Sequence, residues 1–126
     1  MPTIYVSRNG NSNNLKLRDS QNHNPGNDQL TTNVLPDDTV TWELDPQGSN
    51  LDSLVSVTKT TSGDPSFDSK SIDLLQGNPT INNGVLTGKV IKLSPGKGKY
   101  ESYKIGFKIT SSGPILYDDP KLQMDA

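Results

Sequence analysis

Apolar and polar residues alternate with a period of two in two stretches of the chain, residues 39–44 and 103–109. Successive side chains of a β-strand point to opposite faces of the sheet, so this alternation predicts two strands that each turn one face to the core. The residues expected to point inward are Val40, Trp42 and Leu44 in the first stretch and Tyr103, Ile105, Phe107 and Ile109 in the second.

Weaker strand patterns occupy much of the remaining chain. Short runs rich in apolar and β-branched residues, separated by turn residues, lie at residues 3–8, 15–18, 30–35, 54–59, 85–93, 115–117 and 121–124. Many short strands without a linker between them are typical of one sandwich or barrel domain. The chain is therefore predicted to be all-β, with one domain over residues 1–126. We expect an antiparallel Greek-key β-sandwich of two sheets and about seven to nine strands.

Turn residues indicate how the expected strands are joined. Asn83-Gly84 lies between residues 80–82 and 85–90 and suits a type I′ hairpin, whose two central residues take positive φ angles. Residues 94–98, Ser-Pro-Gly-Lys-Gly, are expected to form a second hairpin, which joins the strand at 85–93 to a strand at 100–110. Two mainly polar stretches, residues 19–29 and 62–75, are expected to be surface loops.

The composition excludes several classes of protein. No Cys is present, which rules out disulfides, zinc ribbons and a thiol nucleophile. A net charge of −2 disfavours a general nucleic-acid binder, which needs an excess of Lys and Arg to neutralise phosphates. The chain has neither a run of about 18 apolar residues nor a signal peptide, so we expect no membrane partner and favour a cytoplasmic location.

Groups suited to catalysis are sparse. His23 is the only imidazole and is expected in an exposed polar loop, where nothing orients it as a base. The two glutamates, Glu43 and Glu101, are expected on outward strand faces. Acid–base hydrolysis would need two carboxylates that face each other across a cleft. We therefore predict that the protein is not an enzyme and needs no cofactor, and a hydrolase with paired carboxylates is the alternative.

The aspartates provide candidate ligands for calcium. The chain has twelve Asp and only two Glu, and many of the Asp lie in predicted turns. Carboxylate oxygens from neighbouring loops at one end of a sandwich can coordinate Ca²⁺, although aspartates in turns also hydrogen-bond their own backbone. No segment matches the D-x-D-x-D-G calcium loop. The candidate ligands are Asp45, Asp52, Asp118 and Asp119, and a further loop has Asp64 and Asp68 on either side of residues 65–67.

Lysines and tyrosines supply the other candidate binding residues. Six lysines and a single acid fall within residues 89–108, so the predicted 94–98 hairpin would be basic, and its Lys97 and Lys99 would contact an acidic partner. We predict a non-catalytic binding or assembly module that contacts a protein partner or a second copy through a strand edge or this basic hairpin. The alternative is a carbohydrate-binding module that stacks sugar on the tyrosines expected outside the core, Tyr5, Tyr100 and Tyr117.

Residues 34–42 carry a resemblance to a known fold family. Their sequence, Val-Leu-Pro-Asp-Asp-Thr-Val-Thr-Trp, resembles the V-x-P-G-D-x-V-x-W strand entry of cupredoxin-like Greek-key sandwiches, with Asp37 in place of the usual Gly. Residues 100–124 look like the last two strands of that family. The resemblance implies a turn at residues 36–38, after which Val40 and Trp42 point into the core.

The same resemblance implies no copper centre. Copper-carrying members of the family have a His shortly after the Trp-bearing strand and a Cys near the final loop, and this chain has neither. What remains is a resemblance to small, copper-free bacterial proteins of cupredoxin-like fold. Such a resemblance implies a fold and no activity.

Overall fold

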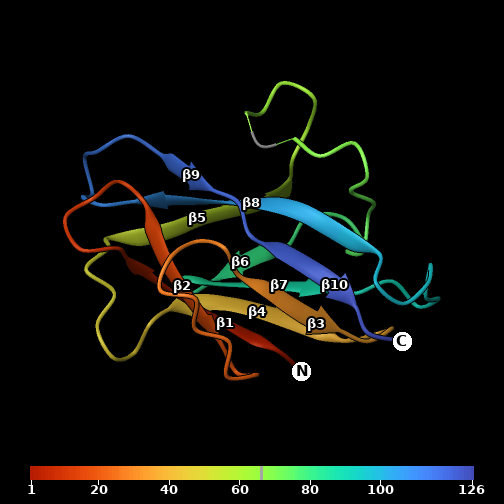
Figure 1. Ribbon diagram of the computed structural model, residues 1–126. Coiled ribbons are helices and arrows are strands. Elements are labelled where there is room, and N and C mark those ends of the chain that lie inside the picture. Colours follow the sequence, from red (N-terminus) through yellow and green to blue (C-terminus); the bar gives the residue numbers. More distant parts are fainter. Residues whose placement is uncertain (66) are drawn as a thin grey trace.

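The chain folds into two layered β-sheets in the computed structural model, which describes residues 1–65 and 67–126 (Figure 1). These residues contain ten strands, and none of them forms a helix that could cross a membrane. The predicted all-β sandwich is confirmed, with one strand more than the upper end of the expected range. Ser66, which belongs to the predicted loop at 62–75, lies outside the described residues.

The first sheet has the strand order β2-β1-β4-β7-β6, and the second has the order β3-β10-β8-β5, in which β9 also pairs with β8. The strand bounds are β1 (Thr3–Arg8), β2 (Leu15–Asp19), β3 (Thr31–Val34), β4 (Thr39–Leu44), β5 (Ser53–Lys59), β6 (Thr80–Asn82), β7 (Val85–Lys89), β8 (Tyr100–Lys108), β9 (Leu116–Asp118) and β10 (Lys121–Met124). In Figure 1, β5, β8 and β9 run along the upper layer, and β1, β4 and β7 run along the lower one.

Both sheets are mixed. β1 runs parallel to β4 and β3 runs parallel to β10, whereas the other strand pairs are antiparallel. Parallel neighbours need a crossover connection. Here the chain leaves the first sheet after β2, passes through β3 in the second sheet, and returns as β4 beside β1. The predicted antiparallel pairing therefore holds for most strand pairs and fails for these two.

The lysine-rich segment before β8 is a connection between the sheets, so the predicted basic hairpin is wrong. β7 pairs with β4 and β6 in the first sheet, whereas β8 pairs with β5, β9 and β10 in the second. The strand predicted at 85–93 ends at Lys89, and Val90 makes only an isolated bridge to Leu75. Because β7 and β8 belong to different layers, the six lysines do not share one hairpin surface.

Trp42 and Tyr103 join the two layers at the centre of the core. Both side chains are fully buried, and the indole N–H of Trp42 donates to the Tyr103 hydroxyl at 3.0 Å. Their rings pack edge to face with centroids 5.5 Å apart. The turn before β4 contains Asp37 with a φ of 69°, at the position that the resemblance assigns to Gly. The predicted inward faces are confirmed, and only their end residues, Leu44 and Ile109, are partly buried.

The hairpin predicted at Asn83-Gly84 is confirmed. It joins β6 to β7, and the two residues have φ angles of 52° and 80°. Positive φ at both central positions is what a type I′ turn requires. β6, the first strand of this hairpin, was not among the nine predicted strands and brings the total to ten.

The segment that follows β5 rises over the outer face of the second sheet (Figure 1). Three side-chain contacts tie it to β8: Lys104 Nζ lies 3.0 Å from Asp64 Oδ1, the Tyr100 hydroxyl donates to Asp68, and the Ser102 N–H donates to Ser71 Oγ at 2.8 Å. The described part of the predicted loop at 62–75 is therefore an anchored cover over β8.

Glu101 is buried, so the prediction that it faces outward is wrong. Only 3% of the residue is exposed, and its Oε1 accepts the backbone N–H groups of Leu74 at 2.6 Å and Leu75 at 3.1 Å. Glu101 is two residues before Tyr103 on β8 and therefore points to the same, inward side. Burial raises the pKa of the Glu101 carboxyl, and the two backbone donors act in the opposite direction.

Candidate functional site

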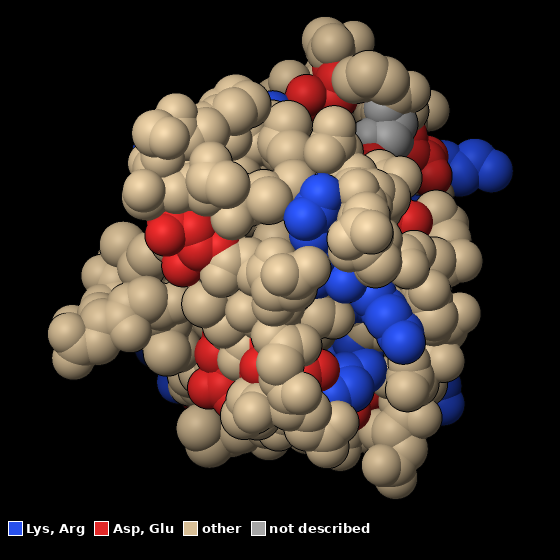
Figure 2. All heavy atoms as spheres, turned by 90° about the vertical axis from the view of Figure 1, so that its left-hand side faces the viewer, with Lys and Arg blue, Asp and Glu red and all other residues tan. Residues whose placement is uncertain are grey.

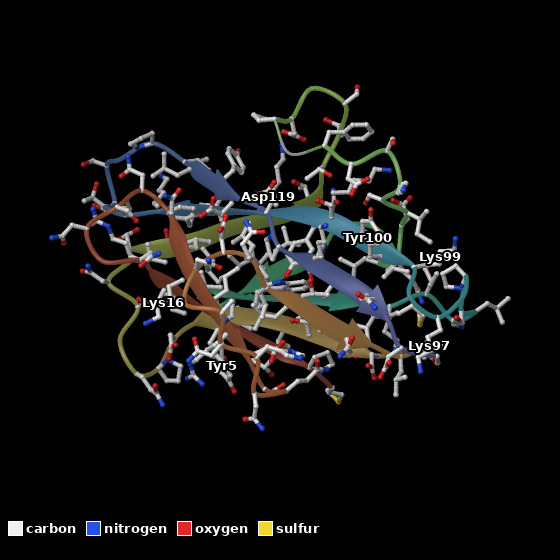
Figure 3. All side chains as sticks on the ribbon, viewed as in Figure 1. Tyr5, Lys16, Lys97, Lys99, Tyr100 and Asp119 are labelled. Carbon is white, nitrogen blue, oxygen red and sulfur yellow. The ribbon has the colours of Figure 1, made fainter. Side chains whose placement is uncertain are left out.

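A groove on the outer face of the second sheet brings together several residues that the sequence singles out. Its volume is about 210 Å³, and β8 forms its floor. The segment after β5 forms one wall, and β9 with the residues that follow it forms the other. Figure 3 shows Asp119 where β9 gives way to β10. We call this hollow the β8 groove, and its lining residues are Asp64, Pro65, Lys104, Tyr117, Asp118 and Asp119.

The aspartates of the groove lie at a break in the strand that borders β8. β9 and β10 pair one after the other with the same edge of β8. Pro120, between them, has no N–H to give to the sheet, and its carbonyl accepts the N–H of Tyr103 at 3.2 Å. The break puts Asp118 and Asp119 at the rim of the groove.

Tyr117 presents an aromatic ring to the groove and is 52% exposed. The ring lies close against β8 at Gly106, where an added Cβ would be only 3.1 Å from Tyr117 Cε1. The ammonium of Lys104 lies 5.0 Å from the ring centroid, within the range of a cation–π contact. The glycine and the lysine therefore fix the position of an aromatic ring that remains open to solvent.

Lys104 also connects the two walls of the groove. Its ammonium pairs with Asp64 at 3.0 Å, and the two side chains are 27% and 20% exposed. The pKa of Asp64 is lowered, first by the hydrogen bond from the Thr61 backbone and then by Lys104. The pair holds the segment after β5 against β8, so this wall of the groove is anchored.

Three carboxylates meet beside the groove. Asp28, from the polar loop after β2, joins Asp118 and Asp119, and one oxygen of each lies within 4.8 Å of the others. The backbone N–H of Leu15 donates to Asp118 Oδ2 at 2.6 Å. Within the described residues, no Lys or Arg nitrogen lies within 4.0 Å of these three carboxylates. We call this group the aspartate cluster.

The aspartate cluster resists full ionisation. The pKa of Asp118 is raised to about 6, mainly by burial and further by the charges of Asp28 and Asp119, against the opposing hydrogen bond from Leu15. Burial and the charge of Asp28 also raise the pKa of Asp119. The negative charge of the cluster therefore decreases as the pH falls toward 6, and no Lys or Arg of the described residues pairs directly with its carboxylates.

The four aspartates predicted as calcium ligands divide between two regions. Asp118 and Asp119 lie in the aspartate cluster. Asp45 instead accepts two hydrogen bonds from Arg18, at 2.8 and 2.9 Å, which lower its pKa, and Asp52 is exposed in the connection before β5. Sequence reasoning missed Asp28, because it is 90 positions away from Asp118 in a loop with no distinctive spacing.

The three candidate sugar-stacking tyrosines do not form one platform. Tyr5 lies on β1 in the first sheet, under the Arg18 guanidinium at 4.2 Å, and Figure 3 shows it in the opposite layer from Tyr100. Tyr100 donates its hydroxyl to Asp68, and Lys121 lies 4.9 Å from its ring centroid. Only Tyr117 lines the β8 groove.

Lys97 and Lys99 lie far from the β8 groove. Both are exposed in the connection between the sheets, and Figure 3 shows them at the opposite end of the molecule from β9. Backbone hydrogen bonds hold this segment, from Gly98 N–H to the Met124 carbonyl at 2.9 Å and from Met124 N–H to the Lys99 carbonyl at 2.7 Å. Contact of these lysines with an acidic partner stays a prediction.

The chain itself covers part of the strand edges on which predicted assembly depends. Along β2, the N–H of Leu17 donates to the Asn27 carbonyl at 3.0 Å. Along β3, the Gln21 side chain makes two hydrogen bonds with the backbone of Asn33, at 2.6 and 2.9 Å. β5 has an irregular register, whereas the short edge strand β6 is exposed and carries Ile81 at 49% exposure. Such covering and irregularity oppose edge pairing, which leaves β6 as the most accessible edge.

His23 is oriented by a buried carboxylate, so the prediction of a loosely held imidazole is wrong. Its Nδ1 lies 2.8 Å from Asp19 Oδ2, and the Asp19 side chain is fully buried while that of His23 is 41% exposed. The Thr32 hydroxyl donates to the same Asp19 oxygen at 2.7 Å. Asp19 therefore joins the loop after β2 to β3, and no Ser or Thr hydroxyl of the described residues hydrogen-bonds the imidazole.

Basic and acidic side chains alternate over the face of the molecule that Figure 2 shows. Lys and Arg atoms form an interrupted line across this face, and Asp and Glu atoms lie on both sides of it. A surface with mixed signs produces no extended field that would steer one large charged partner. The β8 groove is therefore a more specific candidate site than this face as a whole.

Comparison with known proteins adds no family to these observations. No protein-family model matches this chain, and no curated protein matches it.

Proposed function

We propose that this protein is a non-catalytic binding module that takes a saccharide in the β8 groove. The observation that carries this proposal is the open ring of Tyr117 beside three polar groups, on Lys104, Asp64 and Asp119. A sugar ring has an apolar C–H face, which packs on an aromatic ring, and a rim of hydroxyls, which pair with charged and polar side chains. Apolar contact combined with a few directed polar groups is the usual composition of a small-molecule site.

The size and stiffness of the groove support a short ligand. Its volume of about 210 Å³ is below the range of roughly 300–1,000 Å³ for drug-sized ligands, so it would take about one sugar ring. Tyr117 rests on Gly106, and Lys104 pairs with Asp64. Side chains that are already held in position lose little conformational freedom on binding, which favours affinity.

Replacing Tyr117 with alanine is expected to weaken saccharide binding about tenfold, a change of about 1.4 kcal/mol, because the stacking surface is lost. Tyr117→Phe keeps the ring and should bind within about threefold of the original protein. Tyr5→Ala is the matched control, since Tyr5 lies in the other sheet. A glycan array followed by calorimetry with the bound sugars makes the measurement. Failure of the original protein to bind any saccharide, or unchanged binding by Tyr117→Ala, would contradict the proposal.

A second candidate function is calcium binding by the aspartate cluster. Its carboxylate oxygens lie within 4.8 Å of one another, and two ligands of one Ca²⁺ at about 2.4 Å each are at most about 4.8 Å apart. The oxygens therefore gather around one point, as ligands of a single ion do. A glycosidase instead needs its two carboxylates on opposite sides of the substrate, so we favour a cation over acid–base hydrolysis here.

Calcium should raise the unfolding midpoint of the metal-free protein, and at a concentration of a hundred times Kd the gain is about 2.7 kcal/mol. Asp118→Asn is expected to abolish this gain while its amide oxygen still accepts the Leu15 N–H. Asp52→Asn removes the same charge outside the cluster and should keep the response. Thermal unfolding with a chelator, with Ca²⁺ and with Mg²⁺ gives the comparison. If the original protein shows no shift in millimolar Ca²⁺, the cluster is not a calcium site.

The pH dependence of Asp118→Asn supplies a second readout for the cluster. The pKa of Asp118 is raised to about 6 in the folded protein, above its unfolded value. The favourable contribution of the protonated form is therefore complete below the unfolded pKa and is lost as pH rises through about 6. Without metal, Asp118→Asn should be at least as stable as the original protein at neutral pH, and this advantage should vanish in acid.

Two further expectations also remain proposals. Contact with a protein partner or a second copy would use the exposed β6 edge or the segment with Lys97 and Lys99. We also infer a copper-free, cupredoxin-like fold of bacterial type, for which the support is the turn before β4 and the buried Trp42.

A further inference from the structure

The residues that line the β8 groove carry more negative than positive charges. Among the described residues that line the groove, Lys104 is the only cation, and it is already paired with Asp64. The carboxylates of Asp118 and Asp119 remain, and Asp28 adjoins them. A ligand in this groove therefore meets a surplus of negative charge on the side away from Lys104.

The groove already holds one primary ammonium in a defined way. The Nζ of Lys104 lies 3.0 Å from a carboxylate oxygen of Asp64 and 5.0 Å from the centroid of the Tyr117 ring. The face of an aromatic ring attracts cations, and a carboxylate supplies the opposite charge. Tyr117 and Asp119 both line the groove, so an aromatic ring and a carboxylate are also available to an ammonium that belongs to the ligand.

The carboxylates of Asp118 and Asp119 would also weaken the binding of acidic and neutral sugars. A uronic acid would bring a further negative charge next to Asp118 and Asp119, and like charges at short range oppose binding. A neutral sugar would leave the surplus charge of the groove unmatched. Burial and the charge of Asp28 raise the pKa of both carboxyls, and Lys121 acts in the opposite direction on Asp119.

We propose that the ligand of the β8 groove is an amino sugar, whose ring packs on Tyr117 and whose protonated amine pairs with Asp119 and its neighbour Asp118. This inference rests on the proposed function, because it specifies the class of saccharide that the groove selects. The groove distinguishes amino sugars from neutral sugars by their charge. A sugar whose amine has lost its positive charge should therefore bind no better than a neutral sugar.

Calorimetry near pH 7 with a chelator present tests the inference with three matched probes. They are a short glucosamine oligomer, its N-acetylated form and a glucose oligomer of equal length. The amino sugar is expected to bind at least about tenfold more tightly than either neutral probe, and the ratio should fall as salt screens the charges. Asp119→Asn should lower the ratio to about one, whereas Asp52→Asn, which changes a carboxylate outside the groove, should keep the ratio.

The outcomes separate this inference from the proposed function. Equal binding of amino and neutral sugars would overturn the inference and leave the saccharide site in place. No binding of any probe would overturn both. If methylammonium binds as tightly as the amino sugar, or if Tyr117→Ala keeps the full affinity, the site is a plain cation site and the inference is wrong. Unfolding curves of each variant confirm that the loss of binding does not come from loss of the fold.

Discussion

Replacing Asp19 with alanine is expected to lower the free energy of unfolding by about 3–5 kcal/mol, because buried donors lose their shared acceptor. The Asp19 side chain is fully buried at the end of β2. Its carboxylate accepts hydrogen bonds from the Gln21 N–H, the His23 N–H, the His23 ring Nδ1 and the Thr32 hydroxyl. These bonds hold the polar loop after β2 and connect it to β3, so the loss is not confined to one contact.

Chemical denaturation measures this loss of stability, and two further variants serve as a comparison and a control. Asp19→Asn keeps the shape of the side chain but exchanges one acceptor oxygen for a donor, which should produce an intermediate loss. Asp125→Ala removes an exposed carboxylate and should change stability by less than about 0.5 kcal/mol. A change of under about 1 kcal/mol in Asp19→Ala would mean that water replaces the carboxylate and that Asp19 does not organise this loop.

Glu101→Ala is expected to lower the free energy of unfolding by about 2–4 kcal/mol, since two buried backbone N–H groups lose their acceptor. The donors belong to Leu74 and Leu75, where the segment that covers β8 returns to the core. Glu101→Gln retains a carbonyl oxygen for both N–H groups and removes the charge, so it should cost less than about 1 kcal/mol. Equilibrium denaturation of both variants gives the comparison, and equal losses would contradict the assigned role of Oε1.

The difference between Glu101→Gln and the original protein should also depend on pH. Burial raises the pKa of Glu101 above its unfolded value. The protonated carboxyl is therefore favoured in the folded state, and its contribution to stability falls as pH rises from the unfolded pKa through the raised one. Glu101→Gln does not titrate, so its stability relative to the original protein should increase from acid to neutral pH. A constant difference would show that the pKa is not raised.

The sequence alone was enough to predict much of the local structure of this protein. A period of two identified β4 and β8 and their inward residues, because alternation along a strand is a local consequence of backbone geometry. Asn83-Gly84 identified the β6–β7 hairpin, because few residue pairs adopt two positive φ angles easily. The same alternation, extended back two residues from Tyr103, would have put Glu101 on the inward side of β8, but a preference for exposed charges led to the opposite prediction.

The pairing of strands was beyond a reading of local patterns. The lysine-rich segment before β8 has the residues of a hairpin turn, yet it crosses between the sheets. The parallel pairs β1–β4 and β3–β10 depend on the path of the whole chain, and no short segment encodes that path. Burial of Glu101 likewise required residues 74–75 to return and supply its two donors.

Some residues of the candidate site were identifiable from the sequence, whereas others were found only in the structure. Tyr117, Asp118 and Asp119 were identifiable from the sequence, because an aromatic residue and a pair of acids beside a proline stand out in a single short segment. Their partners, Asp28, Asp64 and Lys104, are distant in sequence and meet them only in the folded chain. The sequence by itself determined most of the strands, the turn at Asn83-Gly84 and the types of side chain available for binding, because these depend on neighbouring residues. Only the tertiary structure decided which carboxylates lie close together and which tyrosine ring remains exposed, because both depend on contacts between segments that lie far apart along the chain.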